Sequence, residues 1–176
     1  MPAPSAPAPL FTFVQLWERY PDSDPCTTPS GGKAFENQCA IKVGYALAAC
    51  GVKFESFRGP RCTLESVKNR GMVLRAEELA AWLRTRPFAG CPYPLPYTGQ
   101  SFKLGLQGRT GIVFFKDYWL RAGEKVPTGD HIDLWNRDRL TPSLETFARF
   151  TLGIDRMPGL YSDLSRARQV LFWAIA

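Results

Sequence analysis

The sequence has a single histidine and no apolar run long enough to cross a bilayer. Its longest apolar stretches, residues 112–115 and 170–175, are the length of strands, whereas a membrane-spanning helix needs about 20 apolar residues. No two cysteines are separated by two residues, so the usual ligand pattern of a structural zinc site is missing. We therefore expect no membrane insertion, no bound metal and no cofactor.

The chain also lacks a concentrated basic segment. Lysine and arginine exceed aspartate and glutamate by 22 to 16, but they are scattered from Arg19 to Arg168 without a run of five, and no nucleic-acid-binding motif is visible. The net charge of +6 favours anionic surroundings such as lipid head groups or an acidic cell-wall polymer without choosing among them. We interpret it as a solvated basic surface and expect no nucleic-acid partner.

Length and composition fit one globular domain. A chain of 176 residues can bury one substantial core but not two full enzyme domains, and an apolar content of 45% excludes disorder of the whole chain. Residues 1–9 alternate proline with alanine and serine and lack the basic and apolar regions of a secretory signal. The sequence therefore predicts a flexible tail over residues 1–9 and a single domain over residues 10–176.

The number of cysteines is odd, which forbids complete internal pairing. At least one thiol is therefore free among the five cysteines, Cys26, Cys39, Cys50, Cys62 and Cys91. If one cysteine is set apart for chemistry, the other four allow three different pairings, and all four are reduced in a reducing compartment. The sequence leaves the pairing open.

Helices are predicted in the first half of the chain. Apolar residues spaced three and four apart indicate helices over residues 10–20, 37–50 and 75–84. The second helix is the best marked, because Asn37 is a good N-cap and Gly51 follows its last turn.

Strands are predicted in the second half. Residues 110–116, 131–135 and 170–175 are short runs rich in β-branched and aromatic side chains, and the alternating prolines of residues 91–97 require an extended chain. Helices followed by strands, rather than strict alternation, predict an α+β domain in which N-terminal helices pack on an antiparallel sheet.

One cysteine has a reason to stay unpaired. Cys39 is expected near the N-terminus of the helix that begins at Asn37, where free backbone N–H groups and the helix dipole favour a thiolate and can hold an oxyanion. Cys50 lies at the opposite end of that helix and is interpreted as a core or disulfide residue. A nucleophilic cysteine needs a base, and the only histidine is His131, on a predicted strand 92 residues downstream.

Two segments resemble the fourth family of type VI secretion amidase effectors. Residues 37–47, Asn-Gln-Cys-Ala-Ile-Lys-Val-Gly-Tyr-Ala-Leu, resemble its nucleophile-bearing helix, and residues 129–136, Gly-Asp-His-Ile-Asp-Leu-Trp-Asn, resemble its histidine-bearing strand. Residues 170–175 also resemble its last strand. In order and spacing the resemblance runs from Phe35 to Ile175, with sharp matches in the two catalytic segments.

The resemblance implies a papain-like fold of the NlpC/P60 type and hydrolysis of the amide between D-glutamate and diaminopimelate in peptidoglycan peptide stems. Carried over residue by residue, Cys39 would be the nucleophile and His131 the general base. It further implies an antibacterial toxin made in the cytoplasm of the producing bacterium and delivered by the secretion apparatus to the periplasm of the target cell, with a cognate immunity protein.

The sequence departs from the family pattern at two places. Asp130 stands between the glycine and His131, and the stretch 140–142, where the family's orienting acid is expected, contains no carboxylate. Asp133 lies on the same face of the predicted strand as His131, so it is assigned as the third catalytic residue. A surface aspartate paired with Arg137 or Arg139 is the competing interpretation, and Asn136 and Asp138 also remain as orienting groups.

Two other functions remain open. The same Cys39–His131 pair serves a papain-like hydrolase or acyltransferase with another substrate, since the pair does not specify what fills the cleft. Alternatively, both residues are merely packed in a non-catalytic, disulfide-stapled binding module. Substitution of Cys39 separates an enzyme from a binding module, because only the enzyme loses its activity while keeping its fold.

Overall fold

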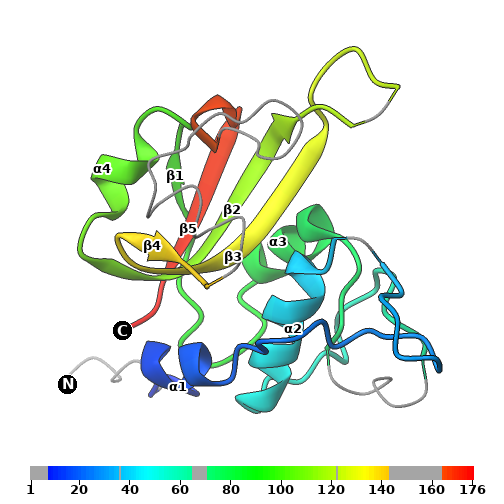
Figure 1. Ribbon diagram of the computed structural model, residues 1–176. Coiled ribbons are helices and arrows are strands. Elements are labelled where there is room, and N and C mark those ends of the chain that lie inside the picture. Colours follow the sequence, from blue (N-terminus) through cyan, green and yellow to red (C-terminus); the bar gives the residue numbers. More distant parts are fainter. Residues whose placement is uncertain (1–7, 36, 65–70, 122, 143–163) are drawn as a thin grey trace.

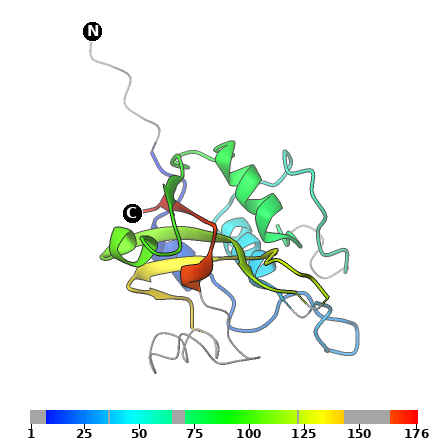
Figure 2. The same cartoon turned by 90° about the horizontal axis from the view of Figure 1, so that it is seen from above.

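A five-stranded antiparallel sheet with helices on both faces forms the protein in the computed structural model, which describes residues 8–35, 37–64, 71–121, 123–142 and 164–176 (Figures 1 and 2). The helices are α1 (Phe13–Glu18), α2 (Cys39–Ala49), α3 (Ala76–Arg84), α4 (Phe102–Leu106) and the 3₁₀ turn η2 (Leu164–Arg166). The strands are β1 (Leu95–Tyr97), β2 (Arg109–Trp119), β3 (Gly129–Arg137), β4 (Arg139–Leu140) and β5 (Gln169–Ala174).

The strands follow the order β1-β5-β2-β3-β4, and every neighbouring pair is antiparallel. The long strand β2 is central and pairs with β5 on one side and β3 on the other. Its register with β3 is regular up to the pair Phe115 and His131 and then shifts before Trp119 pairs with Gly129. A β-bulge of this kind bends the strand and re-aims side chains, and here it lies next to the only histidine.

Alternation along the strands separates two apolar clusters. Ile112 and Phe114 of β2, with Ile132 and Leu134 of β3, pack against α1, α2 and α3. The intervening residues, including Val113 and Phe115, pack against α4 and η2. The sheet therefore carries a core on each face, and the predicted packing of N-terminal helices on an antiparallel sheet is confirmed.

Several boundaries differ from the sequence-based prediction. The first helix is shorter than residues 10–20, because Thr12 and Gln15 close a capping box that begins it at Phe13. The third helix begins one residue late, at Ala76. Strands β2 and β3 extend the predicted runs by one to three residues at each end, whereas β5 begins and ends one residue earlier than predicted. Residues 1–7 of the predicted tail lie outside the described residues.

Helix α2 packs closely against the segment of the chain around Gly71. A Cβ atom on Gly44 would lie 2.0 Å from the carbonyl oxygen of Gly71, so only glycine permits the helix to reach this segment. Within the described part of the chain, no helix has the length and apolar character needed to span a bilayer.

Candidate active site

Cys39 is the first residue of α2 and is partly exposed. The prediction that Asn37 is the N-cap was wrong: the carbonyl of Gln38 accepts the first helical bond, from the Lys42 N–H at 2.9 Å, which makes Gln38 the N-cap. Asn37 still serves the helix start, since its Oδ1 accepts the Cys39 N–H at 3.2 Å. Cys39 thus lies one position nearer the helix terminus than the sequence predicted.

His131 lies on β3 with an exposed side-chain fraction of 17%. Its imidazole packs against the rings of Phe115 and Tyr118, with centroid distances of 6.4 and 6.3 Å. Its side chain also interacts electrostatically with that of Cys39. The fold therefore brings the free cysteine and the only histidine together from α2 and β3.

The ionisation of His131 depends on its neighbours. Burial by itself lowers the pKa of the imidazole, but the charge of a Cys39 thiolate and the Asp133 carboxylate favour the protonated ring and hold its pKa well above the usual value. These neighbours therefore favour the protonated imidazole, the form that can give a proton to a leaving group.

Asp133 lies behind His131 and is only 3% exposed. Its Oδ2 is 3.5 Å from Nε2 of His131, while its Oδ1 accepts the Leu134 N–H at 2.8 Å and the Thr141 hydroxyl at 2.6 Å. Because Nε2 faces the carboxylate, Nδ1 is the ring nitrogen left for the thiol. A carboxylate so deeply buried does not fit the competing interpretation of a surface aspartate paired with arginine.

Two residues of this site were not singled out from the sequence. Thr141 follows β4, in the stretch where a carboxylate was expected, and its hydroxyl holds Asp133. Tyr20, just after α1, lies close enough to both Thr141 and Asp133 to interact with their side chains. Burial raises the pKa of the Tyr20 phenol well above its usual value, and the nearby charges of Asp133 and Cys39 raise it further, so the phenol remains a donor.

The other two orienting groups considered from sequence lie elsewhere. Asn136 and Asp138 line a separate cleft of about 740 Å³ with residues of α1, and neither Cys39 nor His131 belongs to it.

Cys39 lines a cleft of about 590 Å³ whose walls come from α3, β2 and β3. The lining carries charges of both signs: Arg75 and Arg121 lie among the carboxylates Glu77, Glu78, Asp117 and Asp130. A cleft with mixed charges suits a substrate that carries both carboxylate and ammonium groups.

Asp130, which stands between Gly129 and His131, stabilises the backbone of the neighbouring strand β2. Its Oδ1 accepts the N–H of Asp117 at 2.9 Å, and Asp117 adopts a left-handed backbone with φ of 52° at the β-bulge. Burial raises the pKa of the Asp130 carboxyl, and this hydrogen bond opposes the rise. The residue therefore fixes the bulge beside His131 without displacing the histidine from the site.

The other free thiols are poor nucleophiles. Burial raises the pKa of Cys91 to about 11, against the opposing charge of Arg86, and burial also raises the pKa of Cys50, against that of Arg19. Cys26 and Cys62, whose pairing the sequence left open, form a disulfide. Cys50 is thus not a disulfide residue, and Cys39 is the free cysteine that faces both a base and a cleft.

No group of three or more His, Cys, Asp or Glu side chains suited to a metal ion occurs among the residues that the structure describes.

Comparison with protein families finds one whose sequence model matches residues 35–173: "Type VI secretion system (T6SS), amidase effector protein 4", Tae4. Among solved structures, the type VI effector Tae4 from Enterobacter cloacae is similar, with a TM-score of 0.59 at 19% identity over 96% of this chain and 98% of that one. The effector–immunity complex Tae4–Tai4 from the same organism gives a TM-score of 0.60 at 18% identity over 96% and 99%. No curated protein sequence matches significantly.

Proposed function

The chain belongs to the Tae4 family of type VI secretion amidase effectors, and on that premise we propose that it cleaves the amide between D-glutamate and diaminopimelate in the peptide stems of peptidoglycan. The observation that carries the proposal is the convergence of Cys39, His131 and Asp133, with Cys39 lining an open cleft. Membership of an amidase family also favours the catalytic reading of these residues over a non-catalytic binding module. The two-sided helix-and-sheet arrangement supports a papain-like fold of the NlpC/P60 type.

We propose a role for each residue. The Cys39 thiolate attacks the amide carbonyl carbon, and the resulting tetrahedral oxyanion collapses as His131 gives its proton to the departing amine of diaminopimelate. The D-glutamyl group is left as a thioester on Cys39. Water then loses a proton to His131 as it attacks the thioester, which releases the carboxylic acid and restores the thiolate–imidazolium pair. Asp133 holds the ring in place and stabilises its positive charge throughout.

The oxyanion needs donors at the start of α2. The Cys39 N–H is the donor proposed from the sequence, and in the free protein it is bonded to the exposed Asn37 side chain. The amide of Asn37 must therefore move aside when the tetrahedral intermediate forms.

A cognate immunity protein is part of the proposal. The similar Enterobacter cloacae effector is known in complex with an immunity protein. We expect this chain likewise to be neutralised in the producing cell by a partner that covers the cleft at Cys39, and to act after delivery into the periplasm of the target cell.

Mass spectrometry of products tests the substrate. Purified wall peptides that contain diaminopimelate should yield fragments ending in D-glutamate and fragments beginning with diaminopimelate, and Cys39→Ala should yield none. Matched peptides with lysine in place of diaminopimelate lack the side-chain carboxylate, so the ratio of the two cleavage rates measures the preference of the enzyme for that group. Cleavage at a different bond, or of unrelated peptides only, would favour a papain-like hydrolase or acyltransferase with another substrate.

A further inference from the structure

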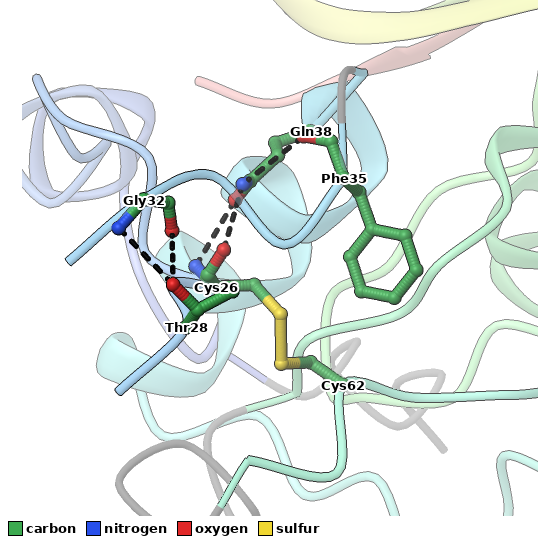
Figure 3. Close-up of a disulfide and its surroundings, with 6 residues drawn as sticks. All are labelled: Cys26, Thr28, Gly32, Phe35, Gln38 and Cys62. Atoms are coloured by element: carbon green, nitrogen blue, oxygen red, sulfur yellow. Dashed lines mark hydrogen bonds between the residues drawn. A yellow bond between two sulfur atoms is a disulfide. The ribbon is translucent and has the colours of Figure 1, made fainter. Parts of the chain in front are cut away.

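Gln38, the residue directly before Cys39, carries a buried polar side chain that is only 4% exposed. Its Oε1 accepts the Cys26 N–H at 3.0 Å, and its Nε2 donates to the Cys26 carbonyl at 2.8 Å and to the Phe35 carbonyl at 3.3 Å (Figure 3). A buried amide that uses both its donors and its acceptor is held in one orientation. The backbone that presents the thiol of Cys39 is therefore tied, through one side chain, to the backbone of Cys26.

Cys26 is itself held by a covalent bond. Its disulfide with Cys62 joins the loop before α2 to the segment that follows it, 36 residues along the chain (Figure 3). Cys62 is fixed in turn by its N–H, which donates to the Met72 carbonyl at 2.9 Å. Both half-cystines pack in one apolar cluster with Met72 and with Ile41 of α2. The disulfide thus lies against the first turn of the helix that carries the nucleophile.

A second contact keeps the same loop near α2. Asp24 pairs with Lys42 at 3.3 Å and with Lys33 at 3.1 Å. These ion pairs do not involve the disulfide, so its reduction loosens the position of Gln38 without releasing the loop.

We propose that Gln38 is a positioning residue for Cys39 and that the Cys26–Cys62 disulfide holds Gln38 in place, so that the hydrolase reaches its full kcat only in the oxidised protein. The inference rests on the proposed role of Cys39 as nucleophile. Its chemical basis is that a near-attack geometry is lost by small displacements of the attacking atom.

The redox step is an ordinary thiol–disulfide exchange. The thiols of Cys26 and Cys62 transfer two electrons and two protons to a disulfide-bearing oxidant, which becomes a dithiol as the protein disulfide forms, and an added dithiol reverses the exchange. Oxidising compartments such as the bacterial periplasm favour the disulfide, whereas the cytoplasm keeps thiols reduced. An effector built in this way gains its full activity where its substrate lies.

Kinetics of the oxidised and reduced protein test the proposal. Wall-peptide hydrolysis is measured for the disulfide form, with a free Cys39 thiol confirmed by mass spectrometry, and for protein reduced with dithiothreitol. We expect kcat to fall by roughly 10-fold on reduction with KM unchanged. Cys26→Ser/Cys62→Ser should have the lower kcat and no response to dithiothreitol.

Gln38→Met makes the same test with the disulfide in place, which matters if the reduced protein does not fold. It removes the hydrogen bonds to Cys26 at similar volume, and it should reproduce the lower kcat and slow the alkylation of Cys39 by iodoacetamide, read peptide by peptide. The matched control is Thr28→Val, which breaks exposed hydrogen bonds to Gly32 in the same loop and should leave both rates unchanged.

The outcomes separate this inference from the proposed function. Folded Gln38→Met with the wild-type kcat and the wild-type alkylation rate would overturn the positioning role, even if Cys39→Ala is inactive. If the wild-type protein hydrolyses no wall peptide, the proposed substrate fails, and the alkylation rates alone still decide whether Gln38 controls the reactivity of Cys39.

Discussion

Replacing Cys39 with alanine is expected to lower kcat for wall-peptide hydrolysis by roughly 10⁴- to 10⁶-fold, as loss of the nucleophile does in other covalent hydrolases. His131→Ala should cost nearly as much, because the thiolate loses both the cation that stabilises it and the acid that protonates the leaving amine. The double variant should be hardly worse than either single one, since the two residues act as a unit.

Cys50→Ala is the matched control for this prediction. Cys50 is a partly exposed free thiol at the opposite end of α2, and burial raises the pKa of that thiol. Its removal should leave kcat unchanged. Wild-type turnover by folded Cys39→Ala, or loss of turnover in Cys50→Ala alone, would show that the nucleophile is wrongly assigned.

Asp133→Asn is expected to lower kcat by roughly 10³- to 10⁴-fold with the fold preserved, the size of effect seen when the acid of a catalytic triad becomes an amide. Asparagine keeps the volume and the Oδ1 acceptor for Leu134 and Thr141, but it loses the charge that faces Nε2 of His131. The pKa of His131 should fall as well, because that carboxylate is one of the groups that raise it.

Two further variants calibrate this effect. Thr141→Val removes one donor to Asp133 and should lower kcat by roughly 10-fold, since the carboxylate keeps its other partners. Asp138→Asn changes a carboxylate five residues beyond Asp133, in the other cleft, and should have no effect. If Asp138→Asn is inactive and Asp133→Asn is fully active, the third residue has been assigned to the wrong aspartate.

The local pattern of the chain predicted most of the sheet and the helices that pack on it. Helix α2 has apolar residues at helical spacing. Strand β2 contains a continuous run of β-branched and aromatic residues, because both of its faces are buried. The short elements α4 and β4 were not predicted. Five and two residues are too few for a periodic signal, and both owe their form to packing against the long strands.

The candidate site could be predicted only in part for a similar reason. Cys39 and His131 follow from one free thiol and one base, both of which can be read along the chain. The residues that support Asp133 could not be identified in that way, because Tyr20 comes from a distant segment and Thr141 reaches Asp133 only after β3 and β4 pair. The Cys26–Cys62 disulfide was equally hidden, since spacing alone does not fix connectivity.

Titration of the single histidine by NMR tests the central claim, that Cys39 and His131 form a thiolate–imidazolium pair. In tag-free protein the imidazole signal can come only from His131. The account predicts that His131 titrates well above its usual range in the wild type, and that in Cys39→Ala its pKa falls, because the thiolate charge is gone and burial still favours the neutral ring. An identical titration in both proteins would contradict the pair.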